Sequence, residues 1–149
     1  TLLVILGLLF STLTYLNRVT DIGPAPDEIE ALTWLKDNLP GEGKVFSTPE
    51  NSEYIRYIAQ KEPLSSFKEP QENSDLRANI LNSSYTSTTF PLLEENNISI
   101  IYFSPLMKQK YPPDQGLRLV LKNEKFKLVH SSGDAEVWMY KQSWPEGSS

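Results

Sequence analysis

Residues 98–103 read Ile-Ser-Ile-Ile-Tyr-Phe, and this stretch decides the interpretation of the rest of the chain. Its near-continuous apolar character is typical of a central strand that is covered on both faces. Helices on both sides of a sheet provide that cover. The stretch therefore indicates an α/β protein.

Helices and strands alternate on either side of this stretch. In front of it, Pro26 can occupy a first helical turn, and Asp27 and Glu28 suit the positive end of a helix dipole. Behind it, Ser131-Ser-Gly-Asp134 is a hairpin signal. In chain order we expect a helix ending near Pro40-Gly41, a strand at 44–47, a helix opening at Pro49, a second strand at 63–67, a polar loop at 68–75 and helices at 76–81 and 87–96. After the central strand we expect a loop at 104–113, a further helix, and strands at 126–130 and 135–141. The expected apolar faces are Ile29, Leu32, Leu35 and Leu39 in the first helix, Tyr54, Ile55, Ile58 and Ala59 in the second, and Leu117, Val120 and Leu121 in the last. This order predicts a three-layer-like sandwich with a mainly parallel central sheet and a C-terminal antiparallel hairpin.

The chain opens with an apolar run, LLVILGLLFSTLTYL at residues 2–16, and its first charge is Arg18. A full membrane span needs about 20 apolar residues, so we interpret the run as the latter part of a transmembrane helix. Two alternatives stay open: the core of a signal peptide, although no small-residue cleavage site follows, and a buried helix of the domain. We expect the end of a transmembrane helix at 1–19, a linker at 20–26, an α/β domain at 27–141 and a flexible tail at 142–149.

Composition limits the partners and the compartment. The net charge is −5 without a basic stripe, so nucleic acid is a poor partner. The acidic domain favours the outside of the membrane. Asn82-Ser-Ser and Asn97-Ile-Ser are N-glycosylation acceptor patterns, although such triplets also arise by chance. We expect a domain on the extracytoplasmic side of the cell membrane, with Asn82 and Asn97 as possible glycosylation sites.

The sequence contains no complete catalytic set. There is no P-loop pattern, no G-x-G-x-x-G after a strand and no G-x-S-x-G. His130 is the only histidine and lies late in an expected strand, which favours an ordinary structural role. Cysteine is absent, so thiolate ligands are missing as well. We therefore assign no catalytic residue, no metal site and no cofactor to these residues.

One location carries a functional hypothesis. Glu50, Asn51 and Tyr54 follow the strand at 44–47, and in α/β sheets ligands bind beyond the carboxyl ends of strands. The simpler interpretation is a helix start, with Ser47 or Thr48 as the cap and acidic residues at the positive end of the dipole. Both interpretations stay open, and Glu50, Asn51 and Tyr54 are the candidate ligand-binding residues.

Aromatic side chains offer a further possibility. Stacking on a sugar ring would need several of them on one surface, whereas aromatics at helix and strand positions usually pack in the core. The candidates are Trp34, Tyr54, Tyr57, Tyr102, Trp138 and Trp144.

Three stretches carry a resemblance to a known family. They are ALTWLKDNLP at 31–40 with VFS at 45–47 and YIRYIAQK at 54–61, then PLLEENNISIIYF at 91–103, and FKLVHSSGDAEVWMYK at 126–141. Together they resemble the globular region that follows the last membrane helix in archaeal and bacterial membrane glycosyltransferases of the oligosaccharyltransferase-like superfamily. The resemblance covers most of residues 25–141.

The resemblance has one important departure. In oligosaccharyltransferase catalytic subunits, a Trp-Trp-Asp-Tyr-Gly motif after the first strand helps to hold the hydroxyl residue of the acceptor peptide. The corresponding residues here are Thr48-Pro-Glu-Asn-Ser52, in which only Glu50 approximates the motif. The resemblance also implies that catalytic carboxylates and metal ligands lie in loops between upstream membrane helices.

We expect, from these observations together, an extracytoplasmic accessory domain of a polytopic membrane protein that resembles a glycosyltransferase acting on a lipid-linked donor. Its expected partners are the membrane, the upstream transmembrane region, and a glycan or lipid-linked sugar. The alternative is a single-span anchored binding module that recognises sugars or a protein partner.

Overall fold

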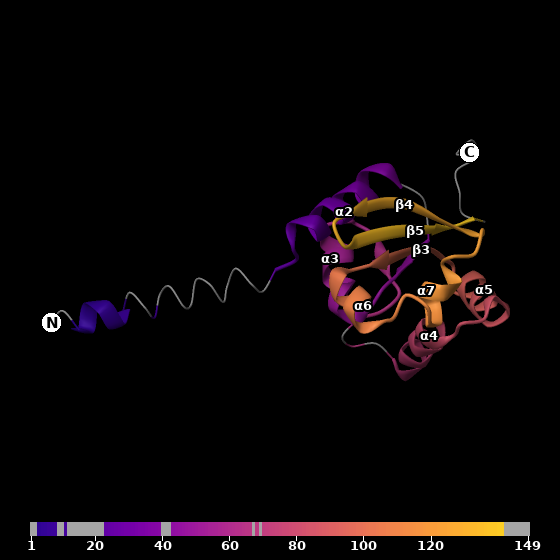
Figure 1. Ribbon diagram of the computed structural model, residues 1–149, viewed down its shortest axis with the longest axis horizontal. Coiled ribbons are helices and arrows are strands. Elements are labelled where there is room, and N and C mark those ends of the chain that lie inside the picture. Colours follow the sequence, from indigo (N-terminus) through magenta and orange to yellow (C-terminus); the bar gives the residue numbers. More distant parts are fainter. Residues whose placement is uncertain are drawn as a thin grey trace.

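The computed structural model describes residues 3–8, 11, 23–39, 43–66, 68 and 70–141. One five-stranded sheet with the order β2-β1-β3-β5-β4 forms the centre of the domain (Figure 1). β1 is parallel to both β2 and β3, whereas β5 is antiparallel to both β3 and β4. The strands are β1 Lys44–Phe46, β2 Glu62–Pro63, β3 Ile98–Phe103, β4 Phe126–Ser132 and β5 Ala135–Tyr140.

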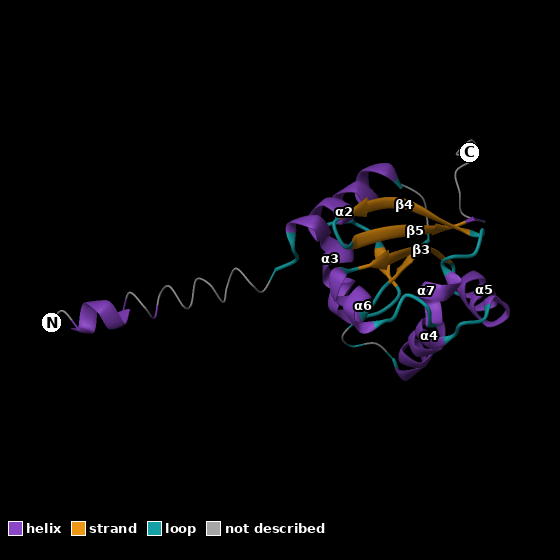
Figure 2. Ribbon diagram, viewed as in Figure 1, coloured by secondary structure: helices purple, strands orange, loops and turns teal. Residues whose placement is uncertain are grey.

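Helices cover both faces of the sheet (Figure 2). The helices are α2 Pro26–Asn38, the 3₁₀ turn η1 Pro49–Asn51, α3 Ser52–Tyr57, α4 Gln71–Asn82, α5 Thr86–Glu95, α6 Pro105–Lys110 and α7 Gly116–Val120. Leu35 of α2 and Ile55 of α3 lie in the core on one face. Ile80 of α4, Leu93 of α5 and Leu117 of α7 lie in the core on the other face. The α/β sandwich and its C-terminal hairpin are therefore confirmed, with the parallel pairing confined to one half of the sheet.

β3 is the central strand that the sequence predicts, and all six of its residues are buried. Ile100 and Tyr102 belong to the core beneath α2 and α3. Ile101 and Phe103 belong to the core beneath α4, α6 and α7. Successive side chains of a strand point to opposite faces, which explains why an almost continuous apolar run is needed at this position.

The apolar face of α2 differs from the predicted one. Ile29 is 44% exposed, whereas Ala31, Leu32 and Leu35 are completely buried. Ile29 lies at the edge of the stripe set by Leu32 and Leu35, because successive helical residues are separated by about 100° around the axis. Glu28 is partly buried instead: its carboxylate accepts a hydrogen bond from the Tyr102 hydroxyl at 3.3 Å and one from the Ala25 N–H at 2.9 Å.

Two expected loops contain helices. α6 lies within the expected loop 104–113, where Ser104 caps it by accepting a hydrogen bond from the Met107 N–H at 3.3 Å. α4 begins at Gln71, inside the expected loop 68–75, and the Gln71 side chain donates to Asp75 at 3.0 Å one turn later. Local polar contacts and packing against the core, in which Met107 and Ile80 take part, accompany the helical state of these segments.

The strand expected at 63–67 is reduced to Glu62–Pro63, and the hairpin turn is tighter than expected. Ser131 and Ser132 belong to β4, which leaves Gly133 and Asp134 as the turn. Gly133 has φ +53°, a conformation that two-residue hairpin loops require and that glycine adopts without strain.

The described part of the N-terminal run consists of residues 3–8, which are helical, and residue 11. Its apolar side chains are exposed, with Leu3 at 87% and Leu8 at 64%. Among the described residues, no helix combines the length and the apolar character that a membrane crossing requires. The remainder of the run, the first residues of the expected linker (20–22) and the tail at 142–149 lie outside the described residues, so the expected domain boundaries stay predictions.

Candidate functional site

The candidate residues lie where β1 and β3 end side by side. After β1 the chain passes to α3, which packs on one face of the sheet, and after β3 it passes to α6, which packs on the other. Such a divergence between neighbouring parallel strands is a topological switch point, where α/β proteins commonly form a ligand crevice. The structure therefore places the residues that follow Phe46 and Phe103 at a position suited to binding.

Between these two strand ends lies the buried side chain of Asn51. It is 5% exposed, and its Nδ2 donates to the Ser47 Oγ at 2.8 Å and to the Ser104 Oγ at 3.2 Å. The Ser47 hydroxyl in turn donates to the Tyr102 carbonyl oxygen at 2.9 Å. The Met107 sulfur lies 3.5 Å from Asn51 Nδ2. Both amide protons are used inside the protein, so Asn51 joins the two strand ends.

Glu50 lies beside Asn51 but is exposed. Partial burial raises the pKa of its carboxyl, but hydrogen bonds from its own backbone N–H and from Thr48 lower it, and so do the charges of Lys110 and Arg77. The lowering effects outweigh burial and hold the pKa of Glu50 below its usual value. Glu50 is therefore an ionised carboxylate, open to solvent, with basic side chains nearby.

Tyr54 points to a different part of the molecule. It is partly buried and packs against the core beneath α2 and α3, whereas the basic neighbours of Glu50 lie on α4 and α6. Of the three candidates, only Glu50 combines exposure with charge. Whether Glu50 or Tyr54 binds a ligand stays a prediction.

The sequence did not predict an ion pair that lies near the end of β3. Lys108 Nζ lies 2.6 Å from Glu136 Oε1, with the two side chains only 17% and 21% exposed. The other oxygen of Glu136 accepts a hydrogen bond from Trp138 Nε1 at 3.0 Å. This pair ties α6 to β5, two elements whose contact could not be inferred from their separation in sequence.

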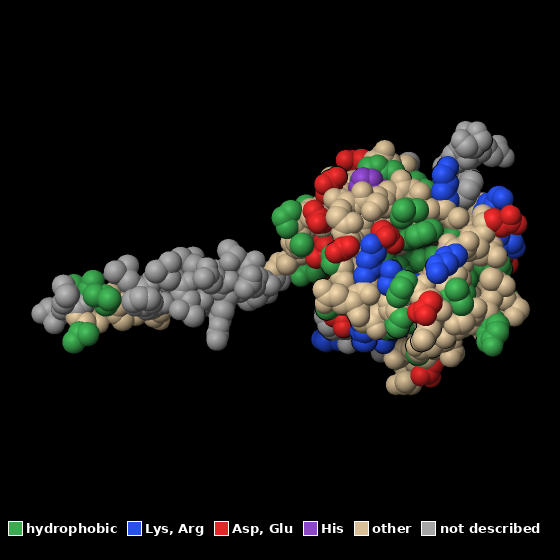
Figure 3. Space-filling model, in the orientation of Figure 1, with side chains coloured by type: hydrophobic (Ala, Val, Ile, Leu, Met, Phe, Trp, Pro, Cys, Tyr) green, Lys and Arg blue, Asp and Glu red, His purple; other side chains and the backbone are tan. Residues whose placement is uncertain are grey.

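His130 is packed against neighbouring side chains. Its ring stacks on Trp34 with centroids 4.7 Å apart and planes 9° from parallel. Its Nε2 is buried and lies 4.0 Å from Glu30 Oε1, while the other Glu30 oxygen accepts from the Ser132 hydroxyl at 2.9 Å. Figure 3 shows this histidine beside acidic side chains near α2. The surroundings agree with the structural role expected for His130.

The aromatic residues do not gather on one exposed surface. Trp34 and Tyr102 contribute to the core on the α2 side, whereas Trp138 packs on the opposite face. Tyr57 is 74% exposed on α3. Trp144 lies outside the described residues. Core packing of these aromatics, the more common case, therefore prevails over a sugar-stacking surface among the aromatics that the structure describes.

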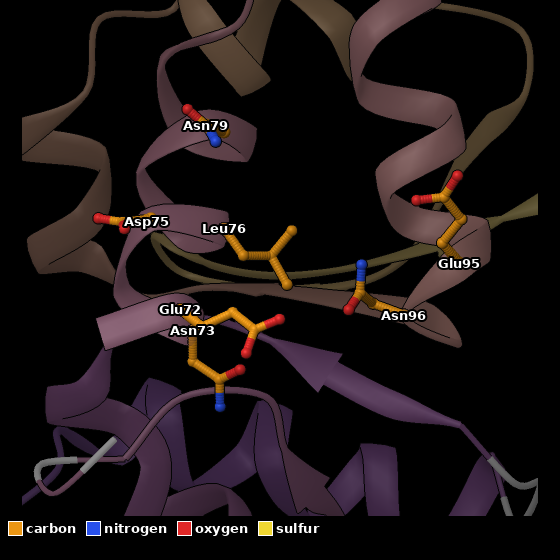
Figure 4. A pocket seen from close by; sticks show the side chains of 7 residues that line it. All are labelled: Glu72, Asn73, Asp75, Leu76, Asn79, Glu95 and Asn96. Atoms are coloured by element: carbon orange, nitrogen blue, oxygen red, sulfur yellow. The ribbon is translucent and has the colours of Figure 1, made fainter. Parts of the chain in front are cut away.

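A polar groove separates α4 from α5 (Figure 4). Its volume is about 690 Å³, and Leu76 lies between the two helices with polar side chains around it. A second hollow of about 490 Å³ shares Asn79 with it and continues past Leu92. The first groove is lined by Glu72, Asn73, Asp75, Leu76, Asn79, Glu95 and Asn96. Within the described ranges, no cluster of three or more His, Asp or Glu residues could hold a metal ion.

Both expected glycosylation asparagines have exposed side chains. Asn82 is the last residue of α4, and Asn97 precedes β3 with φ +54°. Their third residues differ: Ser84 is partly exposed, whereas Ser99 is 6% exposed within β3. Glycosylation of Asn82 and of Asn97 stays a prediction.

Comparison with solved structures identifies the fold. A C-terminal globular domain of an oligosaccharyltransferase from Archaeoglobus fulgidus matches with a TM-score of 0.64 and 17% identity, covering 80% of this chain and 99% of that domain. A second C-terminal globular domain from the same organism matches with a TM-score of 0.55 and 12% identity, covering 79% and 98%. No protein-family model and no curated protein matches the sequence.

A longer structure from the same organism agrees with these two. The archaeal oligosaccharyltransferase AglB, in complex with an inhibitory peptide and a dolichol-phosphate, matches with a TM-score of 0.57 and 11% identity. The match covers 74% of this chain but only 23% of that one. The chain therefore has the fold of the C-terminal globular domains of archaeal oligosaccharyltransferases, as the resemblance in sequence implies.

Proposed function

We propose that this chain is an extracytoplasmic accessory domain of a polytopic membrane glycosyltransferase of the oligosaccharyltransferase-like superfamily. The observation that carries the proposal is the match to almost the whole of an isolated C-terminal globular domain. Under this proposal, glycan transfer from a lipid-linked donor is performed by the upstream part of the protein. The domain at 27–141 packs on that part and shapes its outer surface.

The direction in which the chain enters the domain supports this role. β5 runs antiparallel to β3 and pairs Glu136 with Phe103, so the hairpin turn lies at the carboxyl end of β3. Gly133 in that turn packs against Asp27 in the first turn of α2. The chain therefore enters at the end of the sheet where β1 and β3 finish, which is the end that carries Glu50 and Ser104. A membrane anchor at 1–19 would direct this end toward the bilayer.

The exposed apolar side chains at residues 3–8 also support a membrane anchor. Leu3, Val4 and Leu8 are each at least 64% exposed. Moving a side chain of this kind from water into an apolar environment is favourable by about 1.5–3 kcal/mol. Lipid would provide that burial, in keeping with a location at the cell membrane.

The proposed role differs from acceptor binding through the Trp-Trp-Asp-Tyr-Gly motif. The corresponding segment, Thr48–Ser52, lacks both tryptophans. Within it, the Asn51 amide donates its hydrogen bonds to Ser47 and Ser104 inside the protein. The exposed carboxylate of Glu50 is the group here that could meet an acceptor or the upstream region. The expected partners are the membrane, that upstream region and a lipid-linked sugar.

The experiment that tests the proposal is to read the full-length gene and map its topology by protease protection in sealed vesicles. We expect several upstream spans, an acidic motif in the first external loop, and residues 27–141 on the outer side. A single upstream span, or a domain facing the cytoplasm, would contradict the proposal.

A second candidate function is a single-span anchored binding module for sugars or a protein partner. The groove between α4 and α5 favours it, because carboxylates and amides around Leu76 can hydrogen-bond a polar ligand. Glycan-array and pull-down binding by the chain, lost in Asn79→Leu but kept in Tyr57→Ala on α3, would support this alternative. Equal binding by both variants would exclude the groove.

A further inference from the structure

The two glycosylation patterns differ in the burial of their serine residues, because Ser84 is partly exposed and Ser99 is 6% exposed. An oligosaccharyltransferase that reads Asn-x-Ser must reach the asparagine amide and the hydroxyl two residues later. Asn82 and Asn97 are both exposed. The accessibility of Ser84 and of Ser99 therefore determines whether each pattern can be recognised and glycosylated in the folded domain.

The pattern at Asn82 lies in a short surface connection. Residues 83–85 join α4 to α5, and Ser83 and Ser84 are both partly exposed. The Ser84 hydroxyl accepts a hydrogen bond from the Gly116 N–H at 2.8 Å. Releasing that hydroxyl requires loss of this bond and fraying of the last turn of α4. Helix ends and loops open at a small fraction of the cost of global unfolding.

The pattern at Asn97 enters the centre of the sheet. Asn97 adopts φ +54°, its N–H donates to the Glu94 carbonyl at 3.2 Å, and its carbonyl accepts from the Lys44 N–H at 2.9 Å. Ile98 and Ser99 are buried in β3, which lies between β1 and β5. Gly43 packs so closely on Ser99 that a Cβ there would meet its hydroxyl. Exposing Ser99 requires removal of the central strand, which amounts to unfolding the domain.

We propose that Asn82 can be N-glycosylated in the folded domain, whereas Asn97 can be N-glycosylated only before the domain folds. In either transfer, a lipid-linked oligosaccharide supplies the sugar. The bond from its anomeric carbon to the phosphate oxygen breaks, a bond from that carbon to the asparagine Nδ2 forms, and the amide loses one proton. The lipid phosphate or diphosphate is the leaving group. This inference is independent of the role proposed above.

The test uses the full chain in detergent micelles, a purified single-subunit oligosaccharyltransferase and a lipid-linked oligosaccharide. Synthetic peptides of residues 78–88 and 93–103 serve as unfolded references, and Asn82→Gln and Asn97→Gln identify the modified position by mass spectrometry. We expect both peptides to be modified. In the folded chain, relative to its own peptide, Asn97 should react at least about a hundredfold more slowly than Asn82.

A destabilised variant separates unfolding from mere surface accessibility. Ile101→Ala removes a buried side chain of β3, so the unfolded population and the rate at Asn97 should both rise by about thirtyfold or more. The rate at Asn82 should change little. Modification of Asn97 in the folded wild-type chain at the rate of its peptide would overturn the proposal. So would a failure of Asn82 to react while its peptide does, or a failure of either peptide.

Discussion

The Asn51 side-chain amide lies 3.2 Å from the Ser104 hydroxyl, and this contact joins the turn η1, which follows β1, to the start of α6. Ser104 also caps α6 through the Met107 N–H. A single amide thus links two segments that leave the sheet toward opposite faces. The junction between them is stabilised by polar contacts inside the protein.

Replacing Asn51 by alanine should destabilise the domain by about 1–3 kcal/mol, because the buried hydroxyls of Ser47 and Ser104 would lose their donor. Urea unfolding followed by circular dichroism measures this change. Asn79→Ala is the matched control, since Asn79 is exposed on α4, and it should stay within about 0.5 kcal/mol of wild type. Equal midpoints for the two variants would contradict a structural role for Asn51.

Gly116 should not tolerate alanine. Its φ is +56°, and a Cβ there would run into the Leu81 carbonyl oxygen at the end of α4. We expect Gly116→Ala to cost at least about 1 kcal/mol, measured as a shift of the thermal midpoint. Gly23→Ala is the control, because no atom lies within 4 Å of a Cβ at that position. A Gly116 variant as stable as this control would show that the α4–α7 contact can relax.

The ion pair between Lys108 and Glu136 should contribute more than an exposed pair. Lys108→Met leaves a largely buried carboxylate without its cation, which we expect to cost about 1–3 kcal/mol. The control is Arg56→Met, which breaks the pair with Glu53, where both side chains are more than 40% exposed. That change should cost at most about 0.5 kcal/mol. Similar losses in the two variants, measured by urea unfolding, would contradict the distinction.

Tyr140 should make stability fall at high pH. Burial, the hydrogen bond from its hydroxyl to Glu94 at 2.7 Å, and the charge of Glu94 raise the pKa of Tyr140 to about 12. In the unfolded chain the hydroxyl of this tyrosine ionises near pH 10, at about its unperturbed pKa. The contribution of Tyr140 is therefore complete below pH 10 and is lost as the pH rises from 10 toward 12.

The measurement is urea unfolding of wild type and Tyr140→Phe between pH 8 and 11. We expect wild type to be more stable by about 1 kcal/mol at pH 8 and to lose that advantage above pH 10. Tyr57→Phe, at an exposed position, should leave the pH dependence unchanged. An advantage that stays constant up to pH 11 would contradict the raised pKa.

The predicted helices and strands agree best with the structure where apolar residues repeat regularly along an element. β3, α5 and the hairpin were predicted nearly at their observed bounds, because burial on one or both faces dictates their composition. α6 and the first turn of α4 were missed. Their helical state depends on Ser104, on Gln71 with Asp75, and on packing against distant elements.

For the candidate site, the sequence predicted the position but not the role of each residue. Its position after β1 follows from the order of elements, so Glu50, Asn51 and Tyr54 could be chosen from sequence. Their different roles could not, because Ser104 and Met107 come more than 50 residues later in the chain and meet Asn51 only in the folded protein.

The sequence by itself determined the central strand, the α/β order and the apolar leading run, because each depends on composition over a few neighbouring residues. Only the tertiary structure decided that Asn51 bonds both Ser47 and Ser104, that Lys108 pairs with Glu136, and that Ser99 is buried in the sheet. The physical reason is that burial and hydrogen-bond pairing of these groups arise between segments brought together by folding, and no local pattern records which segments those are.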